Sequence, residues 1–277
     1  MKKKNNISYL IKDKDKILCL GHKSKLDLES SDLSNLNVDV YYLNYEKNLK
    51  DKLDLDEKVF TSIDEVESEN IKFNVILLSS VLNDVFAQYN INTKDKINNM
   101  FFAKFSELLE DNGSLVIVDY AFPDELGELI LRIKPDYVDE FRRNFWNDFK
   151  TNNKFLELSE QINVVMGSRS LYISASTRYI YELIYHFDLK SHQNSSLDDL
   201  VLSTFNKKDI CDLSELNGLE LVEYSEYFED SYLEDLMHKV SLKSTKGDKI
   251  KLPKNKYIAI FRNRKRDFLW QTDWRFL

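Results

Sequence analysis

The first residue whose type and position could do chemistry is an arginine in a short turn. Arg169 follows a glycine in the turn Met166–Ser170. Loops often carry binding groups, and a guanidinium donates two parallel hydrogen bonds to a carboxylate or a phosphate. We therefore predict that Arg169 contacts an anionic group of a substrate.

A second candidate for anion binding lies near the amino terminus, where His22, Lys23 and Lys25 follow a short apolar run. A loop of this kind at a helix N-terminus attracts an anion through both the helix dipole and the lysine charges. The other interpretation is a solvated loop that contains lysines because the whole chain is rich in them. The sequence leaves both open and favours the solvated loop.

Several common kinds of catalytic site are missing from the sequence. It has no nucleophile-elbow pattern, no phosphate-binding glycine loop and no His-Glu-x-x-His helix. The four histidines have no metal-ligand spacing, so we expect no metal site; they are His22, His186, His192 and His238. Two cysteines, Cys19 and Cys211, form neither a disulfide framework nor a four-cysteine zinc site, and a reduced, cytoplasmic protein is expected.

The first half of the chain predicts a parallel sheet. Apolar runs that are typical of buried strands alternate with helical stretches, and they lie at residues 16–21, 38–43, 73–80 and 115–120. Residues 93–110 form the clearest helical pattern, with Thr93 as N-cap and Asn112-Gly113 as its end. This alternation is typical of a doubly wound α/β fold, in which ligands bind at the carboxyl ends of the strands.

The second half predicts an insertion and then a return to the sheet. Residues 123–215 are expected to be mostly helical and to form a lid, with one helix over residues 174–187. Residues 216–262 are expected to supply the final strands of the core, with a hairpin turn at Thr245–Asp248. The core thus comprises residues 16–122 and 216–262, between a basic lead-in at 1–15 and a basic, aromatic tail at 263–277.

The order of these elements resembles the Rossmann-like fold of the class I S-adenosylmethionine-dependent methyltransferases. The segment Ile17–Lys25 occupies the place of that family's first glycine motif, although only Gly21 is kept and Cys19 replaces the acid. The segment Phe73–Val85 is similar to the fourth-strand motif and its turn. Phe105–Val118 is similar to the helix, the Leu-x-x-Gly-Gly turn and the fifth strand.

The resemblance implies a cofactor, S-adenosylmethionine, and two sets of binding residues. The residues that it places against the cofactor are Leu20, Gly21, His22, Asn44, Tyr45, Ser79 and Ser80. The residues that it places against an acceptor molecule are Asp84, Tyr120, Arg169, Tyr172 and Arg178. Asp84 could equally cap the following turn, and Arg178 could pair with neighbours on an exposed helix face.

The net charge of the chain restricts the kinds of molecule that it is expected to bind. The formal net charge is −8, and because both ends of the chain are basic, the body between them is strongly acidic. An acidic body disfavours a broad nucleic-acid surface and favours a small-molecule acceptor. No apolar run is long enough to predict a membrane span. The tail combines arginines with aromatic residues, a mixture that can bind single-stranded nucleic acid. The acidic body favours instead docking of the tail on the protein itself, on a second copy or on another protein.

Three functions are compatible with the sequence. The first is a methyltransferase that acts on a small molecule. The second is a catalytically inactive protein of the same fold that serves as a binding or partner subunit, which the altered first motif would support. The third is an enzyme that moves another group from the same cofactor or binds another nucleotide in the same place.

Overall fold

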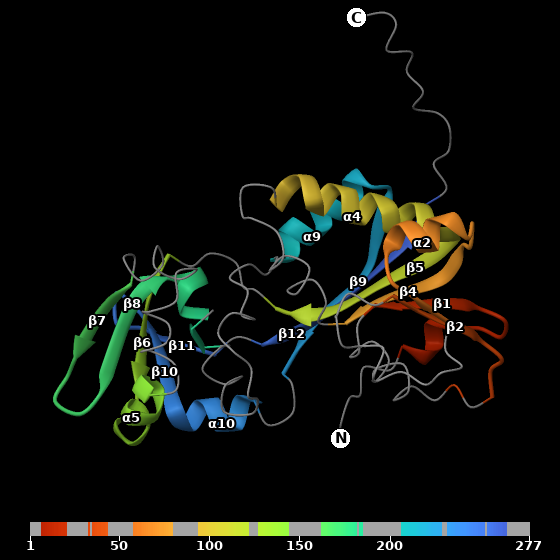
Figure 1. Cartoon of the computed structure of the whole chain (residues 1–277). Coiled ribbons are helices and arrows are strands. Elements are labelled where there is room, and N and C mark those ends of the chain that lie inside the picture. The colour runs from red at the N-terminus through yellow and green to blue at the C-terminus, as the bar shows by residue number, and fades with distance from the viewer. Residues whose placement is uncertain are drawn as a thin grey trace, which may run out of the picture. The chain divides into compact units, whose positions relative to one another are not determined.

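The computed structural model describes residues 7–20, 33, 35–43, 58–79, 94–121, 127–143, 162–181, 183–184, 206–228, 232–252 and 254–264. The chain divides into two compact units, and each is built from segments distant in sequence (Figure 1). Unit 1 comprises residues 1–119, 208–225 and 257–277, and unit 2 comprises residues 120–207 and 226–256. No helix within these ranges is both long and apolar enough to cross a membrane.

Unit 1 contains a seven-stranded sheet with the order β3-β2-β1-β4-β5-β12-β9. Its strands are β1 (Lys16–Leu20), β2 (Asp39–Leu43), β3 (Lys58–Phe60), β4 (Phe73–Ser79), β5 (Leu109–Tyr120), β9 (Leu219–Tyr227) and β12 (Lys256–Asn263). The helices of this unit are η1 (Ser8–Leu10), α2 (Ile63–Ser68), α4 (Lys94–Leu108) and α9 (Lys207–Leu216). The strands and the helix that the sequence predicted in the core are therefore present.

The centre of this sheet is parallel and buried. β1 pairs in parallel with both β2 and β4, and β4 pairs in parallel with β5. Ile17, Leu18 and Cys19 are fully buried on β1, as are Ile76 and Leu77 on β4. A strand that is covered on both faces reads as a continuous apolar run, which explains why the sequence revealed it.

Local sequence signals fix the helix ends that border the sheet. The Ser62 hydroxyl accepts a hydrogen bond from the Glu65 backbone N–H at 3.2 Å at the start of α2. The Glu65 carboxylate in turn accepts the Thr61 N–H at 2.7 Å, so this start resembles a capping box. At the other end of a helix, the Asn263 side-chain amide donates to the carbonyl of Ser106 at 3.2 Å, in the last turn of α4.

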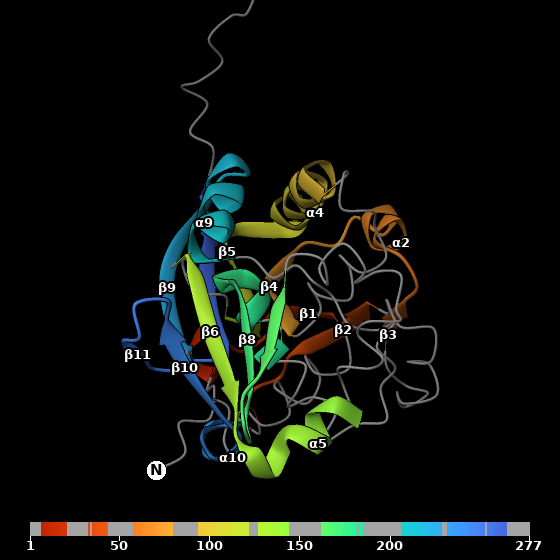
Figure 2. The ribbon, with the colours of Figure 1, turned by 90° about the vertical axis from the view of Figure 1, so that its left-hand side faces the viewer.

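Unit 2 contains an antiparallel sheet that the sequence-based interpretation did not include. The order of this five-stranded sheet is β11-β10-β6-β8-β7, and Figure 2 shows β10, β6 and β8 side by side. Its strands are β6 (Glu128–Ile133), β7 (Asn163–Met166), β8 (Leu171–Ser176), β10 (Val240–Ser244) and β11 (Lys249–Ile250). The helices of unit 2 include η4 (Pro135–Tyr137), α5 (Val138–Phe141) and α10 (Tyr232–Lys239).

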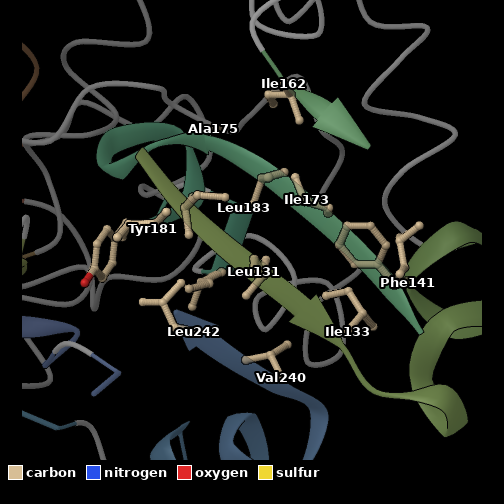
Figure 3. Packing of buried hydrophobic residues seen from close by; sticks show 14 of the residues in the cluster. Leu131, Ile133, Phe141, Ile162, Ile173, Ala175, Tyr181, Leu183, Val240 and Leu242 are labelled. Carbon is tan, nitrogen blue, oxygen red and sulfur yellow. The ribbon is translucent and has the colours of Figure 1, made fainter. Parts of the chain in front are cut away.

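Alternation along the strands builds the core of unit 2. Leu129, Leu131 and Ile133 of β6 point into the core, whereas the residues between them lie on the opposite face. Figure 3 shows Leu131 and Ile133 beside Ile173 of β8 and Phe141 of α5, all in one buried cluster. One face of this sheet is therefore covered, and the other carries polar and half-buried side chains.

These strands correct two features of the predicted insertion. Residues 123–215 were predicted to be mostly helical, but β6, β7 and β8 fall within them. Residues 228–255, between β9 and β12, belong to unit 2 rather than to the core sheet. The helix expected from Ser174 begins instead at Thr177, whose N–H and hydroxyl both donate to the Gly127 carbonyl, at 2.7 and 2.8 Å. The expected hairpin turn is confirmed between β10 and β11, where Gly247 has a φ of +92°.

Candidate functional site

The carboxyl ends of the parallel strands define the candidate site in unit 1. Leu20 at the end of β1 lies opposite Leu43 of β2, and Ser79 at the end of β4 lies opposite Val118 of β5. Because these strands are parallel and in register, their ends meet at one edge of the sheet. Leu20 and Leu43 are completely buried and Ser79 is 1% exposed. Their side chains therefore belong to the core, and these three residues end their strands at this edge.

The predicted cofactor residues are only partly covered by the described structure. Leu20 and Ser79 take the strand-end positions just given. The others lie outside the described residues: Gly21, His22, Asn44, Tyr45 and Ser80, together with Asp84 of the predicted acceptor set. Their roles remain predictions, which rest on the positions of the strand ends that precede them in the sequence.

The direction of β12 follows from contacts at its two ends. The Ala121 N–H, just beyond β5, donates to the Asn255 carbonyl just before β12 at 3.0 Å. At the other end, the Asn263 amide of β12 donates to the Leu109 carbonyl of β5 at 3.4 Å. The end of β5 thus lies beside the start of β12, and the two strands are antiparallel.

The neighbouring strand β9 points the opposite way to β12. The Arg264 N–H, just after β12, donates to the Gly218 carbonyl just before β9 at 3.3 Å. The Arg264 guanidinium also pairs with Glu220 near the start of β9. β9 is therefore parallel to β5, and the described sheet holds six parallel strands with the reversed β12 between β5 and β9.

The order of the seven strands, with β12 reversed between β5 and β9, identifies the fold of the core. The core has a class I methyltransferase-like fold. The described parts of the segments that carry the resemblance form β1, β4, the end of α4 and β5 of this unit.

Comparisons with known proteins give structural neighbours and no sequence relatives. No family model matches the chain, and no curated protein matches its sequence. An S-adenosylmethionine-dependent methyltransferase from Methanosarcina mazei is similar over 93% of this chain and 96% of its own, at 12% identity and a TM-score of 0.40. One from Archaeoglobus fulgidus is similar over 92% of this chain and 89% of its own, at 11% identity and a TM-score of 0.46.

The Asn112-Gly113 pair, which the resemblance placed in a turn, lies within β5, and its two residue types have a clear physical reason. Asn112 adopts a left-handed φ of +63°, a conformation that glycine and asparagine accept most readily. A Cβ on Gly113 would lie 3.0 Å from the carbonyl oxygens of Glu110 and Phe73 and 3.2 Å from that of Asn74. This segment therefore needs one residue that tolerates a positive φ and one that lacks a side chain.

At the end of β5, the structure reveals a residue that the sequence did not single out. Lys256 at the start of β12 is only 2% exposed, and its Nζ lies 3.1 Å from the centroid of the Tyr120 ring. Tyr120 was among the predicted acceptor residues, whereas Lys256 was seen only as part of a strand. A buried ammonium over an aromatic face gains more from the ring than an exposed one does.

Tyr257, which follows Lys256 on β12, is a buried group that keeps its proton. Burial, followed by the charge of Asp119 and the proximity of Tyr224, raises the pKa of Tyr257 well above its usual value. The rings of Tyr224 and Tyr257 stack with centroids 5.6 Å apart. Tyr257 is therefore neutral at physiological pH and can donate a hydrogen bond, but it is not poised to act as a general base.

The predicted acceptor residues of the insertion lie on unit 2 and do not form one cluster. Arg169 is exposed in the turn before β8, and Arg178 is exposed just after the end of that strand. Since a strand rises about 3.3 Å per residue, their backbones are about 20 Å apart, and a small acceptor is expected to contact only one of them. Tyr172 lies near the end of β8 that is closer to Arg169, and its ring centroid is 6.0 Å from Cζ of Arg132.

No metal centre emerges from the described part of the chain. Within those residues, no group of three or more His, Cys, Asp and Glu side chains is placed to hold an ion.

A double-mutant cycle tests the buried cation–π pair. The cycle comprises the wild type, Tyr120→Leu, which removes the ring, Lys256→Met, which removes the ammonium, and the double variant. We expect a coupling free energy of about 1–2 kcal/mol, because the ammonium is desolvated. Chemical denaturation of the four proteins measures it. Tyr41 and Lys58 give an exposed comparison, since that Nζ lies 4.6 Å from the ring centroid and Lys58 is exposed. Because Lys58 also donates a hydrogen bond to the Tyr41 hydroxyl at 3.2 Å, this cycle starts from Tyr41→Phe. Equal coupling in the two pairs would refute the role of burial.

Proposed function

We propose that this chain binds S-adenosylmethionine at the carboxyl edge of unit 1 and transfers its methyl group to a small-molecule acceptor. The observation that supports the proposal is the strand order, which brings Leu20, Leu43 and Ser79 to one edge of the sheet with their side chains inward. In open α/β sheets this edge, where the strand order changes direction, is where ligands bind.

The residues of this edge suit such a cofactor in one structural respect. Ser79 is small and buried, and Leu20 and Leu43 turn their side chains into the core, so main-chain groups are left to meet an adenosine and its ribose. We assign the ribose hydroxyls to Asn44, directly after the end of β2, and the main-chain approach to Gly21, directly after the end of β1. The bound cofactor would supply an electrophilic methyl group on a sulfonium.

The role left to the protein is mainly positional. Transfer requires the acceptor atom in line with the methyl group and water excluded, and a general base is needed only for an acceptor that must lose a proton. Tyr120, Arg169, Tyr172 and Arg178 remain the proposed acceptor residues, with at most one of the two arginines in direct contact. The overall acidic charge supports an acceptor that is a small molecule rather than a nucleic acid.

A second candidate function is a partner subunit without catalytic activity. Cys19 favours it, because this residue is completely buried on β1, opposite Tyr42 and Leu77, in the place of the acid expected from the resemblance. A neutral thiol suits a fully buried position and cannot supply the charge of a carboxylate. In this alternative the sheet is kept for packing while the cofactor contacts are lost.

Calorimetric titration separates the two functions. We expect S-adenosylmethionine and S-adenosylhomocysteine to bind with micromolar affinity, and ATP not to bind. Asn44→Asp is expected to tighten cofactor binding about tenfold, because a charged acceptor makes stronger hydrogen bonds to the ribose hydroxyls. The exposed residue Asn70, near the opposite end of β4, gives a matched control, Asn70→Asp, with the same change in charge and no effect on affinity.

The other outcomes have distinct meanings. No binding of either sulfur compound below millimolar concentration would support the partner subunit and would direct the next experiment to capture of a protein partner. Binding of ATP alone would contradict both functions. Binding of S-adenosylmethionine without release of S-adenosylhomocysteine in the presence of a pool of small acceptors would separate cofactor binding from methyl transfer.

A further inference from the structure

One edge of the antiparallel sheet in unit 2 carries exposed apolar residues and no charge. β7 is the last strand in the order of this sheet, and Figure 1 shows it outermost. Its four residues, Asn163–Met166, include no charged residue and no proline. Val165 is 55% exposed and Met166 is 50% exposed. An edge strand of this composition is open to pairing with another strand.

The opposite edge of the same sheet is protected in a familiar way. β11 has only two residues, Lys249 and Ile250, and Lys246 and Lys251 flank it closely. Short edge strands and lysine side chains prevent further pairing in natural sheets. The two edges therefore differ: β11 has features that prevent pairing with a further strand, and β7 has none of them.

The backbone of β7 shows which groups face outward. The Gly167 N–H donates to the Ser170 carbonyl at 2.9 Å and closes the hairpin with β8. Hydrogen-bonding direction alternates along an antiparallel strand, so Val165, two residues before Gly167, also bonds toward β8. The backbone groups of Val164 and Met166 therefore point away from β8, toward the outer edge.

The face of the sheet to which each residue of β7 points restricts the register of a pairing strand. Val164 packs against the buried cluster and lies opposite Ile173, which points into the core, so Val165 lies on the outer face. Residues directly opposite each other in a continuous sheet must point to the same face. A twofold axis at Val165 meets this condition: it sets Val165 against the same residue of a second copy, and Val164 against Met166.

We infer that β7 pairs antiparallel with β7 of a second copy of this chain, with Val165 at the twofold axis, so that the two sheets form one continuous sheet. In this register Val164 and Met166 exchange both backbone hydrogen bonds across the interface, and the two Val165 side chains lie close together as a non-hydrogen-bonded pair. The two exposed apolar residues of the strand, Val165 and Met166, are thereby covered.

The absence of charge on β7 permits a second copy as the occupant. A chain with a net charge of −8 is repelled by its own copy over most of its surface. β7 carries no charge, so no like charges oppose each other at the axis. A self-complementary strand also satisfies the requirement of a twofold interface that the same surface be used by both partners. The paired strand is short, and we expect a dimer that dissociates on dilution.

Disulfide trapping tests the register directly. In the full chain with Cys211→Ser, which leaves only the buried Cys19, Val165→Cys is expected to give a reducible covalent dimer under mild oxidation. Opposed residues of this kind have Cα atoms about 4.5 Å apart, within the range that a disulfide spans. Lys243→Cys, also exposed but on β10, is the matched control and should remain largely monomeric.

Sedimentation tests the interface without cross-linking. The mass of the wild-type protein is expected to rise toward two chains with increasing concentration, and Val165→Lys is expected to remain a monomer with an unchanged far-ultraviolet spectrum. Leu216→Lys replaces another exposed apolar residue, on α9, and should behave as the wild type. A wild-type protein that stays monomeric at millimolar concentration, or a dimer that persists in Val165→Lys, would overturn the inference.

Discussion

Replacement of Leu131 by alanine is expected to destabilise unit 2 by about 2–5 kcal/mol, because Leu131 is 1% exposed in the middle of β6 and its removal leaves a cavity. The same replacement at the adjacent Ile130 is expected to cost less than about 1 kcal/mol. Ile130 is half-buried on the opposite face of the strand. Urea denaturation, followed by hydrogen exchange in residues 128–133, measures both effects.

This pair of variants separates a strand from a helix at the same position. In a strand, adjacent residues point to opposite faces, so one replacement should be severe and the other mild. In a helix, adjacent residues are about 100° apart, and both could face a core. Similar costs at Leu131 and Ile130 would contradict the antiparallel sheet of unit 2.

Gly113→Ala is expected to destabilise unit 1 by about 1–3 kcal/mol, since the added Cβ would press against backbone oxygens that cannot move independently of the sheet. Two of those oxygens, of Phe73 and Asn74, belong to β4, beside the bulge where the pairing register between β4 and β5 shifts. For a chain of this size each kcal/mol lowers the melting temperature by about 2–4 °C. Differential scanning calorimetry measures the change.

The adjacent residue provides the control for this prediction. Asn112→Gly is expected to change stability by less than about 0.5 kcal/mol, because glycine accepts the left-handed φ of +63° that Asn112 already has. A similar loss in both variants would show that the segment tolerates no change. No loss in Gly113→Ala would show that the close approach between the strands is absent in solution.

The strand ends of the candidate site could be located from the sequence because buried parallel strands leave a local signal. Leu18 and Cys19 on β1 and Ile76 and Leu77 on β4 are enclosed on both faces, so their runs are apolar without interruption. The prediction of β1, β2, β4 and β5, and of Ser79 at a strand end, needed only residues close together in the chain. Gly21, Asn44 and Ser80, which directly follow three of those ends, lie outside the described residues, and their roles stay predictions.

The sheet of unit 2 was missed because its strands are short and half-buried. Glu128–Ile133 alternates in burial, but its sequence contains four apolar residues in six and does not alternate as clearly. Such a run is compatible with a buried helix as well as with a strand. Its partners β8 and β10 begin 38 and 107 residues after the end of β6, and pairing over such distances leaves no mark in any local window.

The sequence by itself determined that this protein has a parallel α/β core whose strand ends meet at one edge, because alternating buried strands and helices leave a periodic pattern. Only the tertiary structure decided that β12 runs against its neighbours, that Lys256 is buried over Tyr120, and that unit 2 ends in the exposed strand β7. Each of these features depends on which distant segment of the chain lies alongside. A local sequence pattern therefore does not reveal the direction of a strand, the burial of a lysine or the exposure of a sheet edge.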